Sequence, residues 1–302
     1  MTNSQMRGHL AMLIFSILVA GSFIFGVRVA NLAEPAAINS ARFIIAALLI
    51  AVYLWFNPTI KMVDFAPLKI APWRYLLLAT VFSAYFIFMF EGLKTAATVS
   101  SSVIFTLIPI MTAIFGYIIL RQVITKRMAL ALTIGAIGAI WVVFRAEISN
   151  LLAFNIGRGE VIYFFGCIFH AAFIPLSRKY NCGEKPIIST LTILIVGGVI
   201  MAIFGYKDLL VVDWLNMPLM FWAGLLYLGI FSSAVTFFLI QYAALALPSG
   251  KVMAYNFLTP VWVILVEVSM GQGWPPLLVS AGIIMAIIAL IMLLKDEQKI
   301  PA

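Results

Sequence analysis

Apolar runs about as long as a membrane is thick recur through the whole sequence, and they restrict its fold more than any other feature. A helix of roughly 20 apolar residues crosses a hydrocarbon core of about 30 Å. The runs are continuous and lack the alternation of a membrane barrel, so helices are expected. Of the 302 residues, 64% are hydrophobic and 10% are charged, unlike a water-soluble domain. The sequence therefore predicts an all-α membrane protein.

Ten such runs divide the chain. They cover residues 9–31, 35–56, 73–93, 97–120, 126–144, 160–177, 186–206, 214–239, 251–270 and 275–294. The first run follows Arg7 and contains the segment VAGS, which resembles a signal-peptide cleavage region. Because the run continues to Val29, longer than a signal core, we expect a retained helix, with a cleaved signal peptide as the alternative. Ten transmembrane helices are the prediction.

Basic residues at the ends of the runs predict the orientation, because cytoplasmic loops are enriched in lysine and arginine. With the N-terminus inside, the outer side holds Arg28, Lys94, Arg145, Arg158 and Lys207, whereas the inner side holds Arg7, Lys61, Lys69, Arg74, Arg121, Lys126, Arg127, Arg178, Lys179, Lys185, Lys251, Lys295 and Lys299. We expect both termini in the cytoplasm. This bias and the attraction of anionic lipid explain the net charge of +8, so the bilayer and not nucleic acid is the expected partner.

The two halves of the sequence repeat each other. The segment IFTLIPIMTAI has a counterpart in YNFLTPVWVIL, and Pro109 and Pro260 lie 151 positions apart. The same offset pairs Gly8 with Gly159, Ala20 with Ala171, Pro35 with Pro186, Ala51 with Ala202 and Leu107 with Leu258. Five runs per half is an odd number, so the second half enters the membrane from the opposite side. The sequence predicts two inverted five-helix repeats, residues 1–150 and 151–302, in one bundle, with a substrate site near the midplane.

Pro109 and Pro260 lie about halfway along their runs. Each ring removes a backbone hydrogen bond, which frees the carbonyl groups of Phe105 and Asn256. We expect the two prolines to act as hinges that border the cavity. Simple packing kinks, which are common in membrane helices, are the alternative.

The chain resembles the drug/metabolite transporter superfamily, in particular its ten-helix EamA-type branch. The resemblance covers nearly the whole chain and includes the two proline helices and the segment EPAAINSARFIIAALL, where Arg42 matches the arginine of the family. The chain differs from the family pattern at Gln122 and Gln272, where the family usually has an acidic residue. It also has Ile193 at the position of the second repeat that corresponds to Arg42. Within the branch it is most similar to bacterial exporters of aromatic amino acids and related metabolites, with amphipathic drugs as further candidate substrates. The resemblance implies export across the inner membrane by alternating access, from a cavity between the first, third, fourth, sixth, eighth and ninth helices.

Polar side chains of these spans are the candidates for the cavity, because a polar group in hydrocarbon is costly unless it is paired. The candidates are Ser83, Tyr85, Ser101, Ser102, Thr106, His170, Thr236, Gln241, Tyr255, Asn256 and Thr259. His170 can bind a substrate carboxylate or change protonation, or act as a neutral partner that joins two helices. Tyr85, Tyr255 and Asn256 suit a small-molecule substrate with one apolar and one polar end.

Charged residues inside the spans suggest a gate and bear on energy coupling. Arg42 lies about two turns inside its run and needs a partner, for which we expect Glu91 or Glu267, as an ion pair or gate. Lys251 begins the ninth run and is expected to snorkel toward water, with capture of an anionic substrate as the alternative. No carboxylate lies at mid-membrane, which favours facilitated transport over proton antiport.

Competing functions need residues that the sequence lacks. A membrane enzyme would need a catalytic constellation such as HExxH or GxSxG, and a channel would need charged rings or a carbonyl filter. We therefore expect no enzyme, no metal and no cofactor. A nucleotide-sugar or organic-phosphate translocator stays open, although few basic residues could meet its phosphates. The small residues Ala131, Gly135 and Ala139, with Gly282 and Ala286, predict close packing between the repeats or in a homodimer.

Overall fold

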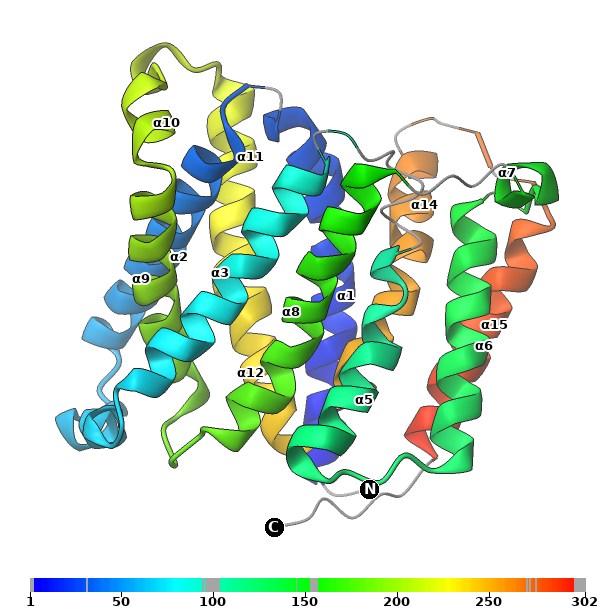
Figure 1. Cartoon of the computed structure of the whole chain (residues 1–302), viewed down its shortest axis with the longest axis horizontal. Helices are drawn as coiled ribbons and strands as arrows, with labels where there is room; N and C mark the ends of the chain where they lie inside the picture. The colour runs from blue at the N-terminus through cyan, green and yellow to red at the C-terminus, as the bar shows by residue number, and fades with distance from the viewer. Residues whose placement is uncertain are drawn as a thin grey trace.

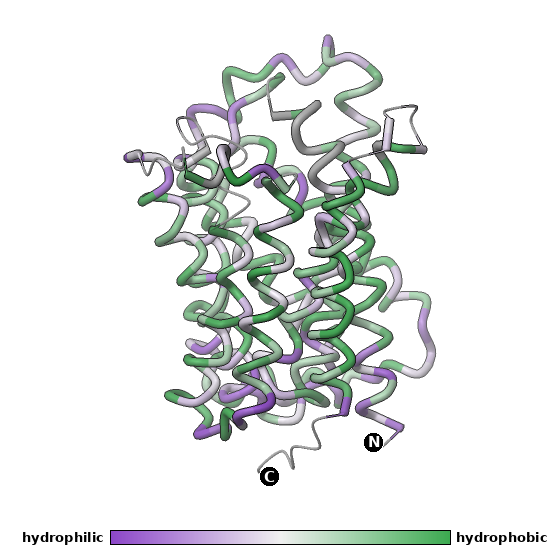
Figure 2. Tube along the Cα trace, turned by 90° about the vertical axis from the view of Figure 1, so that its right-hand side faces the viewer, coloured by the Kyte–Doolittle hydropathy of each residue, from purple (hydrophilic) through white to green (hydrophobic). Residues whose placement is uncertain are grey.

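The structure, a computed structural model, is a bundle of helices (Figure 1). It describes residues 3–30, 32–93, 95, 104–144, 146–152, 157–269, 271, 273–274 and 276–295. Every regular element within these residues is helical. Figure 2 shows that hydrophobic residues dominate the middle of the bundle, whereas hydrophilic residues gather toward its two ends. The predicted all-α membrane protein is confirmed.

Seven helical stretches in the described part of the chain are long and apolar enough to cross a membrane. They are α2 (Pro35–Phe56), α3 (Trp73–Leu93), α6 (Lys126–Val143), α8 (Arg158–Lys179), α9 (Pro186–Phe204) and the composite stretches Leu219–Ala246 and Ser249–Val266. Two shorter apolar helices are α5 (Ile108–Leu120) and α15 (Val279–Leu294). The 28 residues of α1 (Asn3–Ala30) extend about 42 Å at ~1.5 Å per residue. The structure therefore establishes a multi-pass helical protein, and the number of ten spans stays a prediction.

The eighth predicted run differs from the observed helix at both ends. A short 3-10 turn, η2 (Trp214–Asn216), precedes α11 (Leu219–Gly229), because Pro218 adopts an extended conformation in front of the helix. The stretch continues through a π-helix, η3 (Ile230–Val235), into α12 (Thr236–Ala246). The alanines at its end favour helix, and Pro248 follows two residues after it. The predicted run 214–239 therefore begins before the observed helix, which starts at Leu219, and ends before it, since α12 continues to Ala246.

In both proline spans the α-helical geometry is interrupted just before the proline. Pro109 is the second residue of α5, which follows a turn at residues 106–107. The second proline span consists of α13 (Ser249–Ala254), the 3-10 turn η4 (Tyr255–Leu258) and α14 (Thr259–Ser269), in which Pro260 is again the second residue. The first turn of a helix needs no backbone donor, so proline is well tolerated there. Each proline thus starts an α-helical segment directly after an irregular turn, and in this sense we call both spans broken.

The two halves of the chain pack against each other in antiparallel pairs. In Figure 1, α1 begins at the lower end of the bundle and α8 begins at the upper end. The pairs are α3 with α8, α2 with α9, α6 with α15, and α1 with both α11 and α12. At the start of α3, Arg74 contacts Tyr180, which follows α8. At the other end of α3, Gly92 lies beside Gly159. The first and second halves therefore run in opposite directions across the bundle.

Small residues and aromatic rings fill the interface between the halves. A Cβ atom on Gly138 of α6 would lie 2.7 Å from the carbonyl oxygen of Gly282 of α15, so these two helices are in backbone contact. Between α3, α8 and α12, the rings of Phe82 and Phe237 stack at 4.3 Å, and Phe173 lies 5.2 Å from Phe237. Lipid is as apolar as these side chains, so close van der Waals packing holds membrane helices together.

Candidate functional site

Buried polar atoms without a hydrogen-bond partner mark the interface between the two halves. Within the described residues one of them is Arg74 Nε, at the start of α3, and the others are Thr112 Oγ1, Gln122 Nε2, His170 Nδ1, Ser249 Oγ, Asn256 Oδ1 and Thr259 Oγ1. We call the last six residues the unpartnered set. A buried polar atom that forms no hydrogen bond costs about 1–3 kcal/mol. The set belongs to α5 and the loop just after it, to α8, and to the broken span α13–η4–α14. Helix α5 packs against both α8 and α13, so the cost is concentrated around α5.

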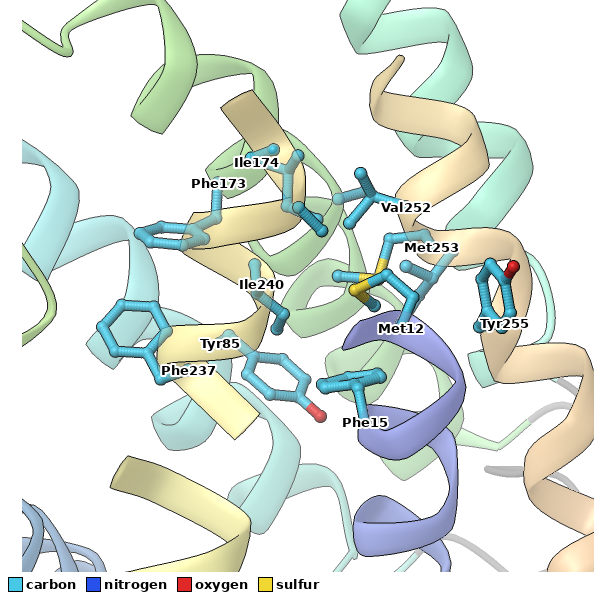
Figure 3. Packing of buried hydrophobic residues seen from close by; sticks show 14 of the residues in the cluster. Met12, Phe15, Tyr85, Phe173, Ile174, Phe237, Ile240, Val252, Met253 and Tyr255 are labelled. Carbon is cyan, nitrogen blue, oxygen red and sulfur yellow. The ribbon is translucent and has the colours of Figure 1, made fainter. Parts of the chain in front are cut away.

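His170 lies between two aromatic rings in the interior of α8. Its ring centroid is 4.3 Å from that of Tyr85 on α3 and 6.4 Å from that of Phe105. Both His170 and Tyr85 are buried. In Figure 3 the Tyr85 hydroxyl points toward Phe15, which comes from α1. The predicted candidates Tyr85 and His170 are thus brought together, and they combine flat apolar faces with polar atoms.

The broken span supplies a second group of predicted candidates. The Asn256 amide donates a weak hydrogen bond to Met253 Sδ at 3.3 Å, and its oxygen faces no partner. Tyr255 lies on the same 3-10 turn, and its hydroxyl lies 3.0 Å from His9 Nδ1 of α1. His9 was missed by sequence reasoning. The sequence feature that could have identified it is its position at the start of the first apolar run, where a polar side chain needs a partner in the bundle.

Other predicted residues take different positions. Lys251 is buried in α13 near His9, so the expectation that it snorkels to water was wrong, because α13 lies against α5 and α1. Gln241 connects three helices: its oxygen accepts a hydrogen bond from Ser177 of α8, and its nitrogen donates to Ser189 of α9 at 2.9 Å. Ser83, Thr106 and Thr236 are buried as well, whereas Ser101 and Ser102 lie outside the described residues.

Arg42 of α2 is buried against the π-helix η3. Its guanidinium donates to Ser233 Oγ at 2.9 Å, to Asn39 Oδ1 at 3.3 Å and to the Ser232 carbonyl at 3.2 Å, all of which are neutral oxygens. Glu91 lines a cleft of about 60 Å³ whose walls include Asn39. The side chain of Glu267 lies outside the described residues. The gate of Arg42 with Glu91 or Glu267 therefore stays a prediction.

A buried ion pair at the end of α3 was also missed. Arg74 Nη1 lies 3.3 Å from Glu184 Oε2, and the same guanidinium donates to the carbonyl groups of Tyr180 and Pro67. Glu184 in turn accepts a hydrogen bond from the Cys182 backbone at 2.8 Å. This pair could not be predicted from sequence spacing, because Arg74 and Glu184 lie 110 residues apart in different halves of the chain. The pair anchors the start of α3 to the loop after α8.

Comparison with known proteins agrees with this architecture. The model of the EamA-like transporter family matches twice, at residues 6–144 and 157–295. The uncharacterized transporter YyaM of Bacillus subtilis (strain 168) is 24% identical over 267 residues, which is 87% of this chain and 86% of the relative. The uncharacterized transporter YcxC of the same organism is 23% identical over 271 residues, 86% and 83% of the two chains.

A solved crystal structure has the same fold. It superposes with a TM-score of 0.76 over 96% of this chain and 95% of that chain, at 14% sequence identity. The family match covers both halves and nearly all of the described residues. The chain belongs to the EamA-like transporter family.

Proposed function

We propose that this protein exports small neutral metabolites, in particular aromatic and other neutral amino acids, across the bacterial inner membrane by alternating access. The single observation that carries the proposal is the unpartnered set at the meeting point of the two broken spans. Discontinuous helices at a repeat interface bind substrate in several transporter folds. Stacked rings beside unpaired hydroxyl, amide and imidazole groups suit a molecule with a flat apolar side and a polar end.

The arrangement of the halves supports alternating access. Two five-helix repeats of opposite direction would give ten spans, both termini in the cytoplasm and a site that either side can reach. The antiparallel pairing of α3 with α8 and of α2 with α9 agrees with this topology. The substrate and the lipid are the partners that this function needs, and the protein works as a monomer or as a homodimer.

Phosphate-bearing substrates fit less well. A nucleotide sugar or organic phosphate is best bound by several basic side chains that can form bidentate hydrogen bonds with its phosphate oxygens. The donors of Arg42 are directed at serine and asparagine oxygens, and Lys251 is a single point charge. The absence of a mid-span carboxylate in the sequence favours transport down a gradient over obligate proton antiport.

Counterflow into proteoliposomes tests the proposal. Vesicles are loaded in turn with amino acids, nucleotide sugars and cationic drugs, with no imposed pH gradient. We expect saturable exchange of aromatic and other neutral amino acids, reduced by Tyr85→Ala and Asn256→Ala. Tyr117→Ala is the matched control, because Tyr117 is 60% exposed on the outside of α5. Exchange of phosphate compounds alone would reject the substrate class, and activity only with a pH gradient would reject uncoupled transport.

A further inference from the structure

A π-helical turn interrupts the stretch Leu219–Ala246 at Ile230–Val235. The backbone N–H of Thr236 donates to the carbonyl groups of Phe231 and Ser233, and not to that of Ser232, its α-helical partner four residues earlier. A π-turn holds about one residue more than an α-turn and often marks a functional position. The hydrogen bonding of this turn is therefore displaced from the α-helical pattern at Ser232.

Arg42 of α2 contacts the turn at this point. Its Nη2 atom donates to the Ser232 carbonyl at 3.2 Å, and its Nε atom donates to Ser233 Oγ at 2.9 Å. The Ser233 hydroxyl in turn donates to the Leu228 carbonyl, five residues earlier, at 2.8 Å. The guanidinium also lies over the ring of Phe86, 4.9 Å from its centroid. One planar fork therefore contacts two consecutive serines of the widened turn, and its fixed donor directions suit this geometry better than the single ammonium of a lysine.

The other half of the chain provides an internal comparison. The offset of 151 residues places Ile193 of α9 at the position of Arg42, and Phe82 of α3 at the position of Ser233. Helix α9 packs against α3 as α2 packs against η3, yet α3 is an uninterrupted α-helix across Phe82. In the described residues, the π-turn thus occurs in the half that has the arginine and serine pair.

We propose that Arg42 is a positioning residue, which holds Ile230–Val235 as a π-turn and so sets the face that α12 presents to α3, α8 and α9. Conversion to an α-helix would rotate α12 by about 100°, the angle of one helical residue. That rotation would remove Phe237 from its stack with Phe82 and Gln241 from its bonds to α8 and α9. The consequence for transport rests on the proposed function, whereas the π-turn itself does not.

Hydrogen exchange on the full-length chain tests the structural part without a substrate. We expect Arg42→Met to accelerate exchange of peptides that cover residues 226–240 by about tenfold to a hundredfold, the factor for loss of a hydrogen bond to a charged group. Ile193→Met is the matched control, with the same new side chain at the equivalent position of the other half. Ser233→Ala is a milder variant that keeps the Arg42 guanidinium, and it should accelerate amide hydrogen exchange of the same peptides. Unchanged exchange of these peptides in both Arg42→Met and Ser233→Ala would overturn the proposal.

Transport kinetics test the positioning role. In proteoliposomes, Arg42→Met should lower the maximal rate about tenfold or more while KM changes less than about twofold, and Arg42→Lys should not restore the rate. A raised KM at an unchanged maximal rate would overturn the positioning role, because it would indicate direct substrate contact. Faster exchange of residues 226–240 together with no transport by the unmodified protein would support the π-turn and reject the proposed function.

Discussion

Replacement of Thr259 by valine removes one hydroxyl group and keeps the branched shape of the side chain. Thr259 is buried, and its Oγ1 atom has no hydrogen-bond partner in the described structure. A buried hydroxyl without a partner costs about 1–3 kcal/mol. If the Thr259 hydroxyl serves to bind substrate and not to stabilise the fold, Thr259→Val should increase the free energy of unfolding of the substrate-free protein by about 1–2 kcal/mol.

Thr190 provides a matched control for the same substitution. It is also fully buried in a membrane helix, but its hydroxyl donates to the Pro186 carbonyl at 2.8 Å. Thr190→Val removes a made hydrogen bond and should destabilise the protein by about 0.5–1.5 kcal/mol. Thr112→Val, on α5, should behave like Thr259→Val, because Thr112 Oγ1 is buried and unpartnered as well.

Thermal unfolding in one detergent separates the three variants. One kcal/mol shifts the midpoint of a large domain by about 2–4 °C, so the valines at 259 and 112 should raise it and the valine at 190 should lower it. Counterflow on the same samples should show loss of transport for Thr259→Val and little change for Thr190→Val. Equal destabilisation by Thr259→Val and Thr190→Val would refute the reasoning, since it would show that the Thr259 hydroxyl is already satisfied.

Three further outcomes are expected. Glu184→Ala should destabilise the protein by about 3–5 kcal/mol in chemical unfolding, because it leaves the buried Arg74 without its carboxylate. The hydrogen bond from Lys185 lowers the pKa of Asp64. This carboxylate therefore stabilises the fold above the aspartate pKa of the unfolded chain and loses that effect as pH falls through the lowered pKa. Asp64→Asn should reduce the acid dependence of the melting temperature below about pH 4, and an unchanged profile would contradict this. Pro109→Ala should change the turnover number more than substrate binding, measured by counterflow and by equilibrium binding.

The elements of this protein follow closely from its sequence. In hydrocarbon every backbone polar group must be satisfied within the chain, so an apolar run of sufficient length has few alternatives to a helix. The observed starts of α2, α3 and α9 at Pro35, Trp73 and Pro186 agree with the predicted runs. His170, Asn256 and Thr259, which were selected as polar residues in apolar spans, belong to the unpartnered set. Local composition was sufficient for these features.

The tertiary structure decided which side chains meet and where the helices break. The hydrogen bond of His9 with Tyr255 joins residues 246 positions apart, and that of Arg42 with Ser233 joins residues 191 positions apart. Such contacts depend on the rotation and packing of whole helices, which hydropathy does not specify. The π-turn at Ile230–Val235 has no proline or glycine within it, and its Ser232 carbonyl accepts a hydrogen bond from a side chain of another helix. Sequence alone therefore determined the helices and their polar candidates, whereas long-range packing determined the site that they form.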